Sequence, residues 1–240
     1  LADFYNDGSL ALFNSLGYPN PDRSHFRSLD IWQSASNANE YWQNGWIGRY
    51  LDAACNGCLK PHAAIEMDDT LSLALKGEKM NGIACRDPKT FRITTQNPLI
   101  ADISNGYVPH DDDHHNVEYL RKTLSEASQS AAYIYQQSKI YKSTQTYPQH
   151  AFGKHLKMVG ELIGSGSDTQ IYYISFPGFD THVGQRGQQN RLFGVYNEAM
   201  KALYSDLKSC GRWNDTLVMT FSEFGRRVKE NAGDGTDHGT

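Results

Sequence analysis

The chain has 240 residues, a formal net charge of −4 and a mean hydropathy of −0.61. This length can bury a sizeable core, so we expect one α/β domain over residues 1–240. Lysines and arginines are scattered rather than gathered on a basic run, which argues against a nucleic-acid partner. No stretch approaches the roughly 18–20 consecutive apolar residues of a membrane span, so we expect no integral membrane segment.

The first half of the chain is expected to alternate short strands with helices. Strand patterns cover residues 9–16, 63–66 and 83–84, and helix patterns cover residues 22–33, 41–54 and 69–75. The aromatic set Trp32, Trp42 and Trp46 has a helix-like spacing in its last two members. We interpret these rings as a packing face rather than as a sugar-binding platform.

The second half continues the alternation. Residues 90–116 are polar and irregular and predict a loop excursion over the sheet. Its last part, residues 111–115 (Asp-Asp-Asp-His-His), is interpreted as an acidic loop before a helix, with a calcium or adventitious metal site as the alternative. Helix patterns follow at 117–141, 152–163 and 190–208, and strand patterns at 170–176 and 216–221. Strands alternating with helices predict an α/β fold with a mainly parallel sheet flanked by helices.

Four cysteines are present, at positions 55, 58, 85 and 210. Cys55 and Cys58 form a C-x-x-C pair without a second such pair to complete a four-thiolate zinc site. We favour a structural disulfide in an oxidising compartment. Reduced structural thiols, a redox pair and half of a zinc site are the alternatives.

Charged residues and histidines gather after the last two predicted strands. The strand, helix and strand between residues 170 and 221 form a predicted βαβ unit, whose two strands run parallel. Parallel strands end at the same edge of a sheet, where open α/β sheets bind ligands. We therefore expect these residues to converge: Asp180, His182, Glu223, Arg226, Asp237 and His238.

Four of these residues have the side chains of a metal site. Asp180 and His182 are two residues apart, so in an extended segment they point to the same side. Asp237 and His238 follow a glycine-rich turn. Carboxylate oxygen and imidazole nitrogen suit zinc or manganese, with calcium or magnesium as alternatives. The competing interpretation is a capping aspartate, a solvent-facing histidine and a polar turn.

Glu223, Arg226, Ser24 and His25 are the candidate catalytic residues. Glu223 is a candidate general base or ligand, and Arg226 a candidate bidentate partner of an anionic group. An ion pair that closes the strand end is the alternative for the arginine. Ser24 and His25 follow a proline turn and open a predicted helix, whose N-terminus favours anions. A capping role is the alternative for the serine.

Several blocks of the chain resemble a bacterial family. They are Ser24-His25-Phe26, residues 45–51 (GWIGRYL), residues 179–182 (FDTH), residues 222–226 (SEFGR) and residues 235–239 (GTDHG). Together they resemble the uncharacterised protein family numbered 1501, many of whose members carry twin-arginine export signals. The resemblance implies export to the periplasm or beyond.

That family in turn resembles the alkaline phosphatase and sulfatase superfamily. This resemblance implies an alkaline-phosphatase-like α/β fold, a metal pair at Asp237 and His238, and a nucleophile at Ser24. The superfamily's Asp-x-x-x-His spacing is replaced here by Asp180-Thr181-His182. Family members extend further at both ends, where the superfamily places additional metal ligands, so we expect the domain to be incomplete at both ends.

The sequence therefore predicts an exported, metal-dependent hydrolase of phosphate or sulfate esters. Its substrate would be a small or glycan-linked anionic ester, and a serine or a water would attack it. The alternative is a non-catalytic periplasmic or surface binding protein that keeps the fold.

Overall fold

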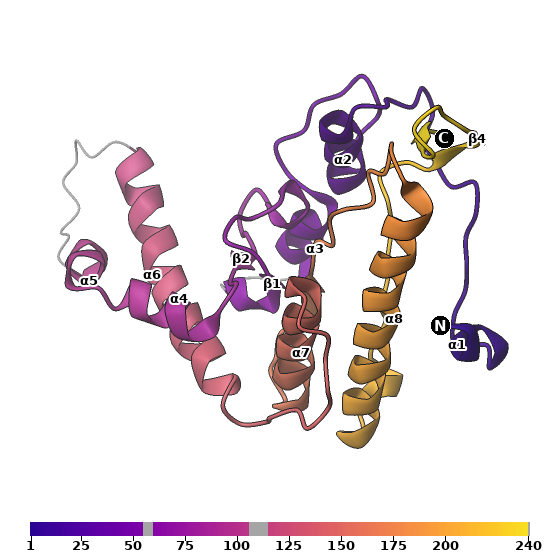
Figure 1. Cartoon of the computed structure of the whole chain (residues 1–240). Helices are drawn as coiled ribbons and strands as arrows, with labels where there is room; N and C mark the ends of the chain where they lie inside the picture. The colour runs from indigo at the N-terminus through magenta and orange to yellow at the C-terminus, as the bar shows by residue number, and fades with distance from the viewer. Residues whose placement is uncertain (55–59, 106–114, 240) are drawn as a thin grey trace.

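The computed structural model describes residues 1–54, 60–105 and 115–239. Over these residues eight α-helices accompany a three-stranded parallel sheet and a small hairpin, so the predicted α/β class is confirmed (Figure 1). The helices are α1 (Ala2–Asn6), α2 (His25–Ser34), α3 (Trp46–Ala54), α4 (Pro88–Thr95), α5 (Pro98–Asn105), α6 (His115–Gln137), α7 (Ala151–Gly164) and α8 (Gln185–Ser209). The strands are β1 (Ala64–Glu66), β2 (Ile83–Ala84), β3 (Ile171–Tyr173), β4 (Arg226–Glu230) and β5 (Thr236–His238), and short 3₁₀ turns lie at Pro61–Ala63, Leu73–Leu75 and Trp213–Asp215.

The parallel sheet has the strand order β2-β1-β3. Ile65 at the centre of β1 pairs in register with Ile83 on one side and Tyr172 on the other. All three residues of β1 are buried, as expected for the middle strand of a parallel sheet covered on both faces.

Helices cover both faces of this sheet. On one face Ile65 and Ile83 pack with Ile134 of α6 and Leu162 of α7. On the other face Ala64 packs against α3 and the Leu73–Leu75 turn through this set: Ile47, Leu51, Ala74, Leu75 and Met80. A third cluster joins α7 to α8, which lie side by side (Figure 1).

Most predicted helices and the three strands of the parallel sheet are confirmed. Helices α2, α6, α7 and α8 correspond to the patterns at 22–33, 117–141, 152–163 and 190–208, and β1, β2 and β3 to those at 63–66, 83–84 and 170–176. None of the helices in the described part of the chain combines the length and apolar character needed to cross a bilayer.

Two predicted strands are wrong. Residues 9–16 and 216–221 adopt no regular structure. Phe13 is 83 % exposed and Leu217 is 90 % exposed. An apolar, β-branched run becomes a strand only where a neighbour accepts and donates its backbone hydrogen bonds and covers one face. Neither segment has such a neighbour among the described residues.

The predicted loop at 90–116 is also wrong over residues 90–95 and 98–105, which belong to helices α4 and α5. Pro88 opens α4, where the Asp87 carboxylate accepts a hydrogen bond from the Thr90 N–H at 2.7 Å, and Pro98 opens α5. Residues 111–114 of the acidic run lie outside the described residues, as do Cys55 and Cys58. Cys85 and Cys210 are free thiols.

The predicted helices at 41–54 and 69–75 are shorter than expected. Only Leu73–Leu75 forms a helical turn, and α3 starts at Trp46. The buried face of α3 is Ile47, Gly48 and Leu51 rather than its aromatic residues. Gly48 allows the close approach, because a Cβ there would lie 2.2 Å from the Lys76 carbonyl oxygen. The interpretation of the tryptophans as a packing face is therefore wrong for Trp42, which is 41 % exposed, and Trp46, which is 37 % exposed.

Candidate functional site

Three segments that are distant in sequence meet beside the start of α8. They are the first turn of α2, the loop from β3 to α8 and the β4–β5 hairpin, in which Arg226 pairs with His238 (Figure 1). The hairpin turn is docked on α8, since Gly184 N–H and Gln185 N–H donate to the carbonyls of Gly233 and Asp234 at 2.9 Å. This docking brings histidines from all three segments to one place.

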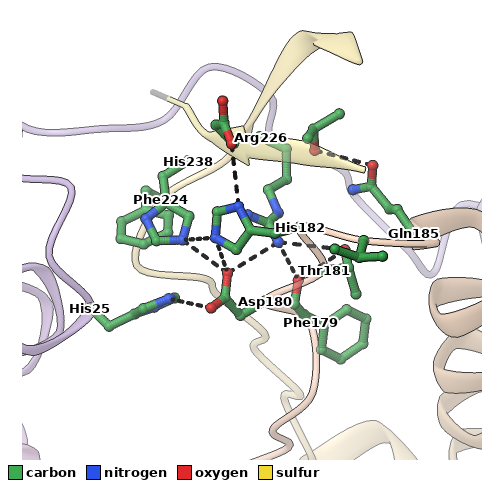
Figure 2. Close-up of polar contacts among 12 residues, drawn as sticks. His25, Phe179, Asp180, Thr181, His182, Gln185, Phe224, Arg226 and His238 are labelled. Atoms are coloured by element: carbon green, nitrogen blue, oxygen red, sulfur yellow. Dashed lines mark hydrogen bonds and ion pairs between the residues drawn. The ribbon is translucent and has the colours of Figure 1, made fainter. Parts of the chain in front are cut away.

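Asp180 lies at the centre of the cluster (Figure 2). Its Oδ1 atom is 2.9 Å from His238 Nε2 and 2.9 Å from His182 Nε2. The two Nε2 atoms are themselves 3.0 Å apart. One carboxylate oxygen and two ring nitrogens thus form a nearly equilateral triangle.

His25 approaches the other oxygen of the same carboxylate. Its Nε2 atom is 3.2 Å from Asp180 Oδ2, yet this buried nitrogen has no hydrogen-bond partner among the described residues. His25, Asp180 and His238 each offer a donor atom, and these atoms lie within 4.8 Å of one another. The cluster therefore contains three imidazoles and one carboxylate.

Each of the three rings is oriented through its other nitrogen. His25 Nδ1 is 2.6 Å from Glu223 Oε1, His182 Nδ1 is 3.3 Å from Asp237 Oδ1, and His238 Nδ1 is 2.9 Å from the Arg23 carbonyl oxygen. A carboxylate or a carbonyl only accepts, so Nδ1 carries the proton in each ring and Nε2 of a neutral ring carries a lone pair. This outer arrangement is typical of histidines that bind metals.

The donor atoms fit a divalent cation. Two Nε2 lone pairs and a carboxylate oxygen at mutual distances of 2.9–3.0 Å repel one another unless a proton or a cation lies between them. Zinc–nitrogen distances of about 2.0–2.1 Å in a tetrahedral site correspond to roughly 3.3–3.4 Å between neighbouring donors. Movements of a few tenths of an ångström would reach that spacing.

The cluster also perturbs its ionisable groups. Partial burial opposes the charged form of Asp180, but its close contacts with the imidazoles of His238 and His25 dominate and lower the pKa of its carboxyl to about 2. Partial burial likewise lowers the pKa of His25, and the carboxylates of Glu223 and Asp180 outweigh it, so that the net pKa is raised. A hydrogen bond from Asn231, then one from His182, lowers the pKa of Asp237. The cluster therefore favours an ionised Asp180 beside a positive charge.

Arg226 adds a fixed positive group at the edge of the cluster. Its Nη2 atom donates to the Phe179 carbonyl at 3.1 Å and to Asp180 Oδ1 at 3.2 Å. Its Nη1 atom is buried and has no hydrogen-bond partner among the described residues. A partly buried guanidinium with unused N–H donors is suited to hold an anionic oxygen.

The structure brings together seven of the eight predicted site residues. The eighth, Ser24, precedes α2, and its side chain makes no capping hydrogen bond. The residues were predicted to meet because two parallel strands end at the same sheet edge, and this reason is wrong, since no strand forms at 216–221. The β4–β5 hairpin brings Arg226, Asp237 and His238 to the site instead. The alternative role of Asp180 as a helix cap is also wrong, because Gly184 precedes α8.

Sequence reasoning missed three contributors to the site. Asn231 shapes the hairpin turn by accepting from Gly233 N–H and donating to the His182 carbonyl at 3.0 Å. Asparagine among glycines is a turn signal that was open to detection. The Phe224 ring packs on His238 with centroids 4.4 Å apart, and the Arg23 carbonyl orients the same histidine. No local pattern indicates those two contacts.

The chain matches the family described as "Protein of unknown function (DUF1501)" over residues 13–240. Comparisons with curated proteins and with solved structures give no match.

Proposed function

This chain belongs to the DUF1501 family of proteins of unknown function, and we propose that it is a divalent-metal-dependent hydrolase of phosphate or sulfate esters. The observation that carries the proposal is the convergence of three Nε2 atoms, from His25, His182 and His238, on the carboxylate of Asp180.

The residues of the cluster would have distinct roles in holding a cation. Asp180, His182 and His238 offer the triangle of donor atoms, and His25 adds a fourth donor facing the second oxygen of Asp180. Asp237 and Glu223 fix the rings of His182 and His25 rather than ligating. In this proposal Asp237 would orient a ligand, whereas the sequence predicted that it would be a ligand itself. Bound zinc or manganese would polarise an ester and stabilise the departing charge.

Other residues explain why an anionic ester is favoured. The unused Nη1 donors of Arg226 would hold a phosphoryl or sulfuryl oxygen beside the cluster. The side chains of Asp180 and His182 are 46 % and 42 % exposed, so a substrate can approach from solvent. A water, or Ser24 immediately before His25, would attack. Glu223, whose Oε1 is the atom that orients His25, would accept the proton of the attacking group directly through its other carboxylate oxygen.

The sequence blocks that resemble the family numbered 1501 bear on the fold and the location of the protein as well as on its site. Their resemblance to the alkaline phosphatase and sulfatase superfamily supports a phosphatase-like fold built around the observed parallel sheet. It also supports an exported protein that acts in the periplasm or outside the cell.

Metal content and ester hydrolysis test the proposal together. The protein is stripped with a chelator, reloaded with zinc or manganese, and analysed by mass spectrometry for bound ion per chain. Hydrolysis of p-nitrophenyl phosphate and p-nitrophenyl sulfate is then followed. His238→Ala should lose both the ion and the activity, whereas His155→Ala, on α7 and outside the cluster, should keep both. Circular dichroism checks that each variant is folded.

The outcomes separate the two functional hypotheses. Binding of about one or two ions per chain with hydrolysis supports the metallohydrolase. Binding of the ion without hydrolysis of either ester, also in the longest version of the protein that folds, would favour the non-catalytic binding protein. Failure of the wild-type protein to retain any ion would overturn the metal site itself.

A further inference from the structure

Two aromatic rings stand out on the surface between α2 and α3. Tyr41 is 74 % exposed and Trp42 is 41 % exposed, although a tyrosine and a tryptophan each gain much from burial. They lie together in the segment that leads into α3, and both line one pocket of about 260 Å³. An exposed pair of large aromatic rings beside a pocket is typical of a ligand-binding site.

Each ring is held in place by an arginine on one side. The Arg27 guanidinium lies 3.9 Å from the centre of the Tyr41 ring, and the Arg49 guanidinium lies 4.7 Å from the centre of the Trp42 ring. The arginines are themselves anchored, since Arg27 Nη2 donates to the Ala38 carbonyl at 2.9 Å and Arg49 Nη2 donates to the Ser34 carbonyl at 2.7 Å. The rings are therefore pre-oriented before any ligand arrives.

Polar side chains surround the rings. Asp30, Gln43 and Lys76 line the same pocket and together offer acceptors, donors and one group that does both. The Asp30 carboxylate makes no hydrogen bond or ion pair with any other described residue. The Nε atom of Arg27 is buried and has no partner in the part of the chain that the structure describes. These groups have capacity left for a ligand.

This combination matches the chemistry of a sugar ring. A pyranose has an apolar face of C–H groups, which packs on an aromatic face, and an edge of hydroxyls, each of which donates and accepts hydrogen bonds. A purely apolar ligand would leave Asp30 and Lys76 desolvated without partners. A small inorganic anion would make no use of the two rings.

We propose that the pocket between α2 and α3 is a carbohydrate-binding subsite, in which a pyranose ring packs on Tyr41 and Trp42 and hydrogen-bonds to Asp30, Gln43 and Lys76. The subsite is separate from the metal cluster but lies on the same helix. His25 opens α2, and Asp30 follows five residues later, about 7.5 Å along the axis. If the proposed hydrolase function holds, the subsite would bind the sugar part of a glycan-linked ester.

Sugar binding is measured on chelator-treated protein, so that the metal cluster has no part in the result. The probes are the methyl pyranosides of glucose, galactose, mannose and N-acetylglucosamine, tested by saturation-transfer NMR and titrated at millimolar concentration. Phenol and inorganic phosphate serve as comparison probes for an apolar ring and for an anion.

Three aromatic variants locate the binding. Tyr41→Ala and Trp42→Ala should each weaken the affinity of the best pyranoside about tenfold. Tyr50→Ala should leave it unchanged, because Tyr50 is an aromatic residue of similar exposure, 49 %, on α3 outside the pocket lining. Asp30→Asn should weaken binding without affecting the rings.

The contrary results are well defined. The proposal is overturned if none of the four pyranosides binds saturably, if phenol or phosphate displaces the sugar with higher affinity, or if Tyr50→Ala weakens binding as much as Trp42→Ala. If the wild-type protein binds the sugar but hydrolyses neither ester, only the proposed enzymatic function is contradicted. Intact hydrolysis without sugar binding would contradict only the subsite.

Discussion

Replacing Asp180 with asparagine in metal-free protein should reduce stability in a pH-dependent way. Asp180 lies beside three imidazoles, and its carboxylate stabilises whichever of them is protonated. The pKa of His25 is raised, so its contribution to stability is complete below about pH 6.5 and is lost as the pH rises through the pKa of the folded state. The pKa of Asp180 is lowered, so its contribution is present above about pH 3.8 and is lost toward pH 2.

The two windows overlap between about pH 4 and pH 6.5. The drop in the pKa of Asp180 from 3.8 to about 2 corresponds to roughly 2.4 kcal/mol at about 1.36 kcal/mol per unit. Because its side chain is 46 % exposed, solvent screening reduces this figure, and we expect about 1 kcal/mol. As the pH rises through the raised pKa of His25, that ring loses its charge and its attraction to Asp180, whereas the contact of Asp180 with Arg226 at 3.2 Å remains.

Urea unfolding with a chelator present measures the effect. Asp180→Asn should lower the free energy of unfolding by about 1 kcal/mol near pH 5.5 and by less than half of that near pH 8.5. Asp52→Asn is the matched control. The Asp52 carboxylate accepts from the N–H groups of Glu78 at 2.7 Å and Met80 at 2.8 Å, and no histidine contacts it, so its cost should be equal at both pH values. An equal cost for Asp180→Asn at both values would refute the electrostatic account.

Two further substitutions test the packing around the site and in the core. Gly235→Ala should weaken metal binding about tenfold or more, because a Cβ there would lie 2.2 Å from the His182 carbonyl oxygen. Gly225→Ala is the control and should leave metal binding unchanged, because a Cβ there meets nothing within 4 Å. Equal effects of the two substitutions in a metal titration would contradict this reasoning. Tyr147→Phe should cost about 2 kcal/mol in urea unfolding, since its hydroxyl donates to the fully buried Asp206 at 2.7 Å. Tyr141→Phe, whose contact with the same carboxylate is 3.4 Å, should cost less than 1 kcal/mol, and the reverse order would count against the assignment.

The helices and the buried strands were within reach of the sequence because their signals are local. Helix α6 and helix α8 follow an apolar spacing of three and four residues over many turns, and a long periodic pattern admits few alternatives. The central strand β1 is fully buried, continues the apolar residues Ala63, Ala64 and Ile65, and pairs with β2 on one side and β3 on the other. Pro98 lies in the segment predicted as a loop but opens α5, because the same residue breaks a helix from inside and starts one from its first turn.

The sequence alone was enough to predict which kinds of side chain make up the candidate site, namely carboxylates, imidazoles and a guanidinium. It did not determine their partners. Residues 216–221 have the composition of a strand, but strand formation depends on a neighbour that the local sequence does not specify. Only the tertiary structure shows that Nε2 of His25 lies beside the Asp180 carboxylate and that the Arg23 carbonyl contacts Nδ1 of His238. Such contacts join residues that are more than 150 positions apart, and they depend on packing between elements rather than on any periodicity within one element.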